Sequence, residues 1–188
     1  TAFLLSKICI EAGLPKGILN IVHGHGAKVG DPLTTHPDTP IISFTGGTVT
    51  GKHIASVTAT MFKKISLELG GKNPNIIFAD ANFDKAVKMA VKAAFSNQGQ
   101  ICLCGSRLFV QKEIYADFKQ ALLDKVSQLT VGDPKKESSN LGAVVSKAHM
   151  NKILGKIEEG KKLGGKILTG GNRVILEGNL KNGYYIEP

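Results

Sequence analysis

The sequence predicts an α/β fold with parallel strands, because short apolar runs alternate with segments of helical periodicity. Apolar runs at residues 41–44 and 64–69 are separated by a stretch of helical character, and both lead into glycines. A second pair of runs, at 75–78 and 107–110, encloses another helical stretch. Successive strands joined through a helix run parallel, since the chain must cross over to return to the same end of the sheet. The expected architecture is one parallel α/β unit followed by a second.

The first half of the chain is expected to alternate helices and strands. In order these are a helix at 1–12, a strand at 18–22, a short helix at 27–35, a strand at 41–44, a helix at 50–60 and a strand at 64–69. The first helix has apolar residues at helical spacing, Gly13 follows as its stop signal, and Pro15 bars its continuation. The run at 18–22 is short and mainly apolar, which is typical of a buried strand.

The second half repeats this alternation. Its expected elements are a strand at 75–78, a helix that Asp84 caps and that extends to residue 96, a strand at 107–110, and helices at 114–129 and 147–163. A turn at Gly170–Gly171 is expected to close the ordered part of the chain. A domain boundary is expected at Gly70–Gly71, because paired glycines permit a sharp change of direction. The two expected domains are therefore residues 1–70 and 71–188.

The composition is typical of a soluble globular protein. Of the 188 residues, 42% are hydrophobic, and no apolar run approaches the roughly 18 residues that span a membrane. The net charge of +9 comes from lysines scattered over different expected elements, and only 6% of the residues are aromatic. This pattern indicates a solvated surface and lacks the interleaved aromatic and basic residues that bind nucleic-acid bases. We expect neither a nucleic-acid partner nor a membrane partner.

The cysteines and the ends of the chain indicate its cellular context. Three cysteines, an odd number, occur without a secretory signal, which favours a reducing compartment, here the cytoplasm. Cys102-x-Cys104 has metal-ligating side chains, but two thiols one residue apart without partner pairs make a weak zinc site, so we expect no metal. There is no initiating Met, no leader and no tail, so the chain is expected to be a segment of a longer protein.

A carboxylate and a thiol stand out as candidate catalytic groups. Glu68 lies near the end of the run at 64–69, where its apolar neighbours predict the partial burial that suits a general base. Cys102 follows the polar turn at 97–100, an accessible setting for a nucleophile. The alternative interpretations are an exposed strand-end Glu and a small buried Cys. No Cys–His dyad is visible, so the sequence does not support a protease-type mechanism.

The glycines after the strand at 41–44 form a candidate phosphate site. They precede an expected helix, where backbone N–H groups and the helix N-terminus bind anions. Residues 46–52 also fit the Gly-x-x-x-x-Gly-Lys pattern of P-loop nucleotide hydrolases, and Asp80 resembles their strand carboxylate. That motif next requires Ser or Thr, but His53 stands there, and imidazole is a poor ligand for magnesium. A plain structural turn is the other alternative.

Three motifs, taken in order, resemble the NAD(P)-dependent aldehyde dehydrogenase superfamily. They are Phe-Thr-Gly-Gly at 44–47, Glu-Leu-Gly-Gly-Lys-Asn-Pro at 68–74 and Gly-Gln-Ile-Cys at 99–102. The resemblance extends over essentially the whole chain. Around the thiol, Ile-Cys-Leu-Cys before a Ser-Arg pair is most similar to the 2-aminomuconic semialdehyde dehydrogenase branch. The resemblance implies part of a Rossmann-like, parallel-sheet cofactor domain joined to part of an α/β catalytic thiol domain.

The resemblance also implies roles for individual residues. Cys102 is the implied nucleophile, which attacks an aldehyde, and Glu68 is the implied general base, which activates the water that releases the carboxylic acid. The residues implied to contact the cofactor are Gly26, Gly46, Gly47, Thr50, Gly51 and Leu69. The implied cofactor is NAD, with NADP left open. The family often has Ser where this chain has Gly47, so a hydroxyl contact to phosphate is lost while the backbone N–H remains.

The resemblance covers less than half of a family-length protein. An Asn that completes the oxyanion site, and the residues that hold the cofactor riboses, belong to other parts of the family's chains. We expect a parent enzyme that is a homodimer or homotetramer and oxidises a small-molecule aldehyde, and we expect these residues alone to turn over little or nothing. A P-loop nucleotide-binding protein and a non-catalytic α/β domain stay open as alternatives.

Overall fold

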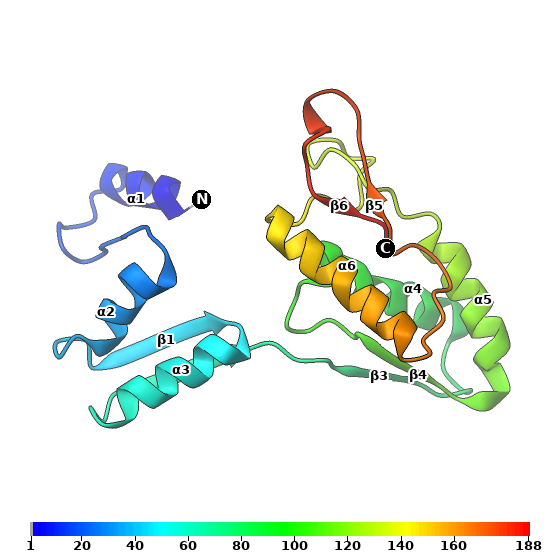
Figure 1. The fold of residues 1–188 in the computed structure, drawn as a ribbon, viewed down its shortest axis with the longest axis horizontal. Coiled ribbons are helices and arrows are strands. Elements are labelled where there is room, and N and C mark those ends of the chain that lie inside the picture. Colours follow the sequence, from blue (N-terminus) through cyan, green and yellow to red (C-terminus); the bar gives the residue numbers. More distant parts are fainter. Residues whose placement is uncertain (1) are drawn as a thin grey trace. The chain divides into compact units, whose positions relative to one another are not determined.

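The computed structural model describes residues 2–188 and divides the chain into two compact units, Thr1–Gly70 and Gly71–Pro188 (Figure 1). We call these the N-terminal unit and the C-terminal unit. Each unit contains one pair of parallel strands accompanied by helices, so the predicted α/β class with parallel strands is confirmed. Among the described residues, no helix is both long enough and apolar enough to cross a membrane.

The N-terminal unit is built on β1 (Ile41–Gly46) and β2 (Lys64–Leu69), which pair in parallel. Its helices are α1 (Ala2–Glu11), the π-helix η1 (Gly26–Gly30), α2 (Asp31–Thr35) and α3 (Thr48–Ala59). α3 is the crossover between the two strands and runs beside them (Figure 1). The helix approaches β2 closely at Gly51, where an added Cβ would lie 2.6 Å from Leu69 Cδ2. A glycine at position 51 therefore lets helix and strand touch.

The N-terminal unit buries little apolar surface. Among its described residues, Ile54 of α3 is the one hydrophobic side chain that is buried, at 4% exposure. α1 has no buried residue, and Phe3 and Ile8 on this helix are 57% and 59% exposed. Since burial of apolar area is the main stabilising term in folding, this unit has a small hydrophobic driving force of its own.

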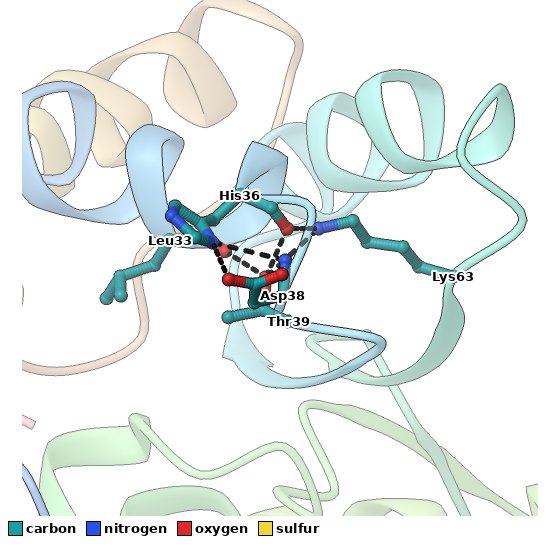
Figure 2. A network of polar contacts seen from close by, with 5 residues as sticks. All are labelled: Leu33, His36, Asp38, Thr39 and Lys63. Carbon is teal, nitrogen blue, oxygen red and sulfur yellow. Dashed lines mark hydrogen bonds and ion pairs between the residues drawn. The ribbon is translucent and has the colours of Figure 1, made fainter.

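Polar contacts join the segment before β1 to the residue before β2 (Figure 2). Lys63 Nζ donates to the carbonyl oxygen of His36 and lies 3.0 Å from Thr39 Oγ1. Thr39 Oγ1 is within hydrogen-bond distance of the carbonyl oxygens of Leu33 (2.7 Å) and His36 (2.8 Å). The backbone N–H of Asp38 donates to His36 Nδ1 at 3.1 Å. These contacts stabilise the start of the β1–β2 pair, where few hydrophobic side chains are buried.

One predicted strand of the N-terminal unit is wrong. Residues 18–22 form no strand, and Ile18 and Val22 are 70% and 59% exposed. A strand is stable only when neighbours satisfy its backbone N–H and C=O groups. Within the described residues β1 pairs with β2 alone, so an apolar run at 18–22 finds no partner strand.

The C-terminal unit combines a parallel pair with helices and a small hairpin-like pair. Its parallel strands are β3 (Pro74–Ile77) and β4 (Arg107–Val110), and its antiparallel strands are β5 (Arg173–Val174) and β6 (Tyr185–Ile186). The helices are α4 (Phe83–Phe95), α5 (Tyr115–Val126) and α6 (Lys147–Lys162). Short 3-10 helices are η2 (Ser96–Gly99), η3 (Lys112–Ile114) and η4 (Gly178–Leu180). α4 is the crossover from β3 to β4.

The core of the C-terminal unit lies between the β3–β4 pair and the helices α4 and α5. Phe118 of α5 is 0% exposed and packs edge to face against Phe83 of α4, with ring centroids 5.7 Å apart. Ile77 of β3 and Val87 of α4 belong to the same cluster. This cluster fixes the crossover helix against the strands that it connects, which determines where the residues after α4 begin.

Two details of the C-terminal unit differ from the sequence prediction. Asn82 rather than Asp84 caps α4, because Asn82 Oδ1 accepts from the Lys85 N–H at 3.0 Å, and Asp84 lies in the first turn. The ordered part of the chain also does not end at Gly170–Gly171, since β5 pairs with β6 beyond it. The other predicted helices and strands of both units are confirmed, with ends that differ by a few residues. Thr1 lies outside the described residues.

Replacing Phe118 by Ala is expected to lower the free energy of unfolding of the C-terminal unit by about 3–5 kcal/mol, because the substitution leaves a cavity at a fully buried site. Urea unfolding followed by circular dichroism measures this loss. Phe78→Ala is the matched control, since Phe78 is 62% exposed. Equal losses for the two variants would contradict the placement of Phe118 at the centre of the core.

Candidate functional site

The thiol turn, which we define as residues 101–104, lies between η2 and β4. The Cys104 N–H donates to the carbonyl oxygen of Ile101 at 3.0 Å, and this bond closes a four-residue turn. Cys102, at the second position of the turn, is exposed. Cys104 is only 6% exposed, and its Sγ lies 3.9 Å from the carbonyl oxygen of Ser96. The two thiols therefore differ in kind: Cys102 faces solvent, whereas Cys104 is part of the packed interior.

The residues that lead into the thiol turn have an unusual backbone. Asn97, Gln98 and Gly99 all have positive φ, at 50°, 55° and 71°. Left-handed conformations are uncommon for residues other than glycine, and such strain tends to occur near functional sites. At Gly99 an added Cβ would also lie 3.0 Å from the carbonyl oxygen of Ala94, so only glycine fits there without a shift. This left-handed stretch turns the chain from the end of α4 into the thiol turn.

Two glutamines connect this stretch with later parts of the C-terminal unit. Gln100 Oε1 lies 3.2 Å from His149 Nε2, near the start of α6. When the Gln98 amide is oriented so that its oxygen faces the Gly142 N–H, the two atoms are 2.7 Å apart. The left-handed stretch is therefore held by contacts as well as by its own backbone preference.

Residues 72 and 73 hold the thiol turn from the side of β3. Asn73 Nδ2 donates to the carbonyl oxygens of Cys102, at 2.6 Å, and of Cys104, at 3.2 Å. The Arg107 N–H donates to the Asn73 carbonyl oxygen at 3.1 Å, and Arg107 Nε donates to the Lys72 carbonyl oxygen at 2.9 Å. The sequence pattern did not single out Asn73. The available signal was its position just before one parallel strand, beside the turn that leads into the other.

Gly105 packs the exit of the thiol turn tightly against α4 and β3. The residue is buried, and its N–H donates to the carbonyl oxygen of Ala93 at 3.0 Å. An added Cβ would lie 3.1 Å from Asn75 Cβ and 3.4 Å from Ala93 Cβ. The turn is therefore anchored on both sides of Cys102.

The predicted partial burial of Glu68 is wrong within the N-terminal unit. Glu68 lies on β2 opposite Thr45 of β1, and it is exposed. Side chains alternate along a strand, so Leu67 and Leu69, which are partly buried, point to the other face of the pair. Ser66, two residues before Glu68, is exposed on the same face as the carboxylate. Leu67 and Leu69 are therefore partly buried on one face of the pair, while Glu68 stays exposed on the other.

The N-terminal unit contains a cavity of about 580 Å³ beside β1, η1, α2 and α3. Of the residues predicted to contact the cofactor, Gly26 and Thr50 line this cavity. Gly46, Gly47, Gly51 and Leu69 are not among its lining residues. Gly51 and Leu69 instead meet each other where α3 packs on β2. The wall is largely apolar, and its ionisable side chains are Asp31 and His53, whose Oδ1 and Nε2 atoms are 3.0 Å apart.

The P-loop alternative is contradicted by the structure. Gly47 alone separates β1 from α3, so residues 48–51 are already helical and leave no loop to surround a phosphate chain. Asp80 follows β3 of the C-terminal unit and not the strand beside β1, which is β2.

Within residues 2–188, no group of three or more His, Cys, Asp or Glu side chains gathers in a way that could hold a metal ion.

The chain contains two α/β units, each with one pair of parallel strands, and an exposed thiol on an anchored turn. Comparison with known families agrees with this α/β class. Residues 1–188 match the model described as Aldehyde dehydrogenase family. The chain belongs to the aldehyde dehydrogenase family.

Curated relatives in animals are 43% identical to this chain over its whole length. One is 2-aminomuconic semialdehyde dehydrogenase of Mus musculus, and another is 4-trimethylaminobutyraldehyde dehydrogenase A of Danio rerio. The chain spans 39% of the length of the first and 37% of the second. Two relatives with different aldehydes in their names are thus equally similar to it.

Solved structures of bacterial proteins share the fold of the whole chain. Betaine aldehyde dehydrogenase of Staphylococcus aureus, crystallised in complex with NAD+, is 41% identical with a TM-score of 0.93, and 37% of its chain is covered. HpcC of Thermus thermophilus is 36% identical with a TM-score of 0.95, again over 37% of its chain. A point mutant of the Staphylococcus enzyme contains a cysteine modified by BME.

Replacing Gly99 by Ala is expected to destabilise the C-terminal unit by about 1–3 kcal/mol, because alanine disfavours positive φ and its Cβ would crowd a carbonyl oxygen. Gly155→Ala is the matched control, for which the opposite change in the free energy of unfolding is expected. Gly155 lies within α6 with nothing near its missing Cβ, so alanine there should stabilise by about 0.4–1 kcal/mol. Urea unfolding of both variants measures the difference, and the same sign for both would contradict the left-handed conformation at Gly99.

Proposed function

We propose that this chain is the segment of an NAD-dependent aldehyde dehydrogenase that carries the nucleophile and the general base. The observation that supports this most is the thiol turn, on which Cys102 is exposed while the backbone around it is anchored. An exposed thiol held at a fixed position is what a covalent mechanism requires. The proposed reaction is the oxidation of an aldehyde to a carboxylic acid.

The proposed mechanism uses Cys102 and Glu68 in turn. The Cys102 thiolate attacks the carbonyl carbon of the aldehyde, and a C–S bond forms while the carbonyl oxygen becomes an oxyanion. Within residues 2–188, the backbone N–H of Cys102 has no hydrogen-bond acceptor, so it is free to donate to that oxyanion. Gly26 and Thr50 would hold NAD, which would supply hydride-acceptor chemistry, and after the hydride is lost Cys102 holds the acyl group as a thioester. Glu68 then takes a proton from water, which attacks the thioester and releases the acid and the thiol.

The two units have different proposed roles. We assign residues 1–70 to the C-terminal part of the NAD-binding domain and residues 71–188 to the N-terminal part of the catalytic domain. The cavity beside β1 supports the first assignment, because its volume and largely apolar wall suit part of an organic cofactor. Gly26 and Thr50 are its proposed contacts. Gly46 and Gly47, between β1 and α3, are proposed to contact the cofactor through the backbone.

The close contact between Gly51 and Leu69 supports a packing role for both, in place of the cofactor contact implied by the motifs.

The Staphylococcus relative crystallised with NAD+ supports NAD as the cofactor. Three cysteines, an odd number, favour a reducing compartment, and we propose the cytoplasm. We propose an aldehyde as the small-molecule substrate and a homodimer or homotetramer as the assembly of the complete enzyme. Because the chain spans 37% to 39% of its relatives, the segment alone is proposed to turn over little or nothing.

Replacing Cys102 by Ser in the complete enzyme is expected to reduce aldehyde-dependent NADH formation by about 10³-fold or more, because the covalent step is lost. Absorbance at the NADH band under saturating NAD measures the rate. Cys9→Ser is the matched control, since Cys9 is also a free thiol but lies on α1. In the unsubstituted protein, Cys102 should react with iodoacetamide faster than the buried Cys104. Retained activity in Cys102→Ser would favour the non-catalytic alternative.

Replacing Thr50 by Phe is expected to weaken NAD binding by about tenfold or more, because the larger side chain would occupy the cavity and displace part of the ligand. Isothermal titration of the complete enzyme with NAD measures the dissociation constant. Ser56→Phe is the matched control, since Ser56 is exposed on the same helix and does not line the cavity. Equal effects of the two substitutions would place the cofactor elsewhere.

A further inference from the structure

One side chain contacts the backbone of the thiol turn twice. Asn73 Nδ2 lies 2.6 Å from the carbonyl oxygen of Cys102 and 3.2 Å from that of Cys104. We call this pair of hydrogen bonds the Asn73 clamp. All its members belong to the C-terminal unit, and Asn73 is itself fixed, because its carbonyl oxygen accepts from the Arg107 N–H at 3.1 Å.

The chemistry of the clamp requires a group with two donor hydrogens on one atom. Both partners are carbonyl oxygens, which can only accept, so the atom that faces them must be the amide nitrogen of Asn73 and not its oxygen. A carboxylate of the same shape has no hydrogen to donate, and a serine hydroxyl has one. Asparagine therefore supplies a contact that its near isosteres cannot reproduce.

The clamp acts on the peptide whose orientation matters most to Cys102. In a four-residue turn, the carbonyl of the second residue belongs to the central peptide, and this peptide can flip between the common turn types. Here that carbonyl is the one of Cys102, and its flip would change ψ of Cys102 and so the direction of the chain around the thiol. The shorter of the two hydrogen bonds from Asn73 opposes this flip. The second bond, to Cys104, holds the end of the turn.

The clamp also leaves the reactive side of the turn open. It uses the carbonyl of Cys102 and not its N–H, which has no acceptor within residues 2–188. The exposed thiol is not part of either bond. A contact that fixes the backbone while leaving the thiol and the N–H free is suited to positioning a nucleophile.

We propose that Asn73 is a positioning residue for Cys102, which holds the central peptide of the thiol turn in one orientation. The proposal rests on the proposed role of Cys102 as nucleophile, but the clamp itself can be tested without any assay of aldehyde oxidation. Asn73→Asp keeps the shape and removes both donors, and Asn73→Leu removes the donors without adding a charge. Asn151→Asp is the matched control, since Asn151 is exposed on α6.

The first measurement is hydrogen–deuterium exchange of the complete enzyme, resolved by peptide. The reporter is the Cys104 N–H, which closes the turn with Ile101. Loss of two hydrogen bonds is expected to raise its exchange rate on the order of tenfold in Asn73→Asp and Asn73→Leu. The interior of α4 and the Asn151→Asp control should change by less than about twofold if only the turn opens.

The second measurement is the rate of Cys102 alkylation relative to that of Cys9 in the same sample. The ratio of the two rates should change in both Asn73 variants, because the direction of the chain around the thiol is no longer fixed, and it should stay unchanged in the control. Unchanged exchange and an unchanged ratio would overturn the proposal. Exchange that rises equally in α4 would also overturn it, because Asn73 would then support the whole unit.

The two proposals fail in different ways. If Cys102 of the unsubstituted chain labels no faster than Cys9 at any pH, its role as nucleophile fails. Faster exchange at Cys104 in the Asn73 variants would still demonstrate the clamp in that case. In the complete enzyme, a positioning role predicts a lower kcat with KM for NAD unchanged, since Asn73 does not lie in the unit that holds the cofactor cavity.

Discussion

The parallel pairing of β3 with β4 is the constraint on which the thiol turn depends. In a parallel pair the two strands start at the same edge, and here Pro74 lies opposite Arg107. The residues just before each strand are therefore neighbours, although α4 and η2 lie between them in the sequence. One of these segments contains Asn73 and the other contains the thiol turn. The backbone bond from Arg107 to Asn73 extends the same pairing by one step beyond the strands.

The crossover helix makes this arrangement rigid. α4 packs on the parallel pair through the cluster around Phe118, and the left-handed stretch begins at Asn97, two residues after the helix ends at Phe95. The N–H of Gly105 donates to the carbonyl oxygen of Ala93 on α4, so the exit of the thiol turn is held against this helix. The core fixes α4, and backbone contacts with α4 in turn fix the position of the thiol turn. Cys102 is therefore held in place although it is exposed.

The sequence predicted the elements that depend on local pattern. Strand boundaries at 64–69 and 107–110, the helices between them and the exposed position of Cys102 follow from periodicity, glycine stops and polar turns. The predicted strand at 18–22 and the predicted burial of Glu68 were wrong, because both depend on which residues lie across from them. The Asn73 clamp was not predicted for the same reason: it depends on pairing between segments far apart in sequence.

The contact between Gly51 and Leu69 limits how this segment can be redesigned. Glycine inside a helix is a usual target for stabilisation, since alanine has the higher helix propensity. At position 51 the added methyl would instead press on the side chain next to Glu68, at 2.6 Å from its nearest atom. A gain in helix propensity would then be offset by a forced shift of the Leu69 side chain. Thermostabilising substitutions are therefore better placed on the outer face of α6 than on α3.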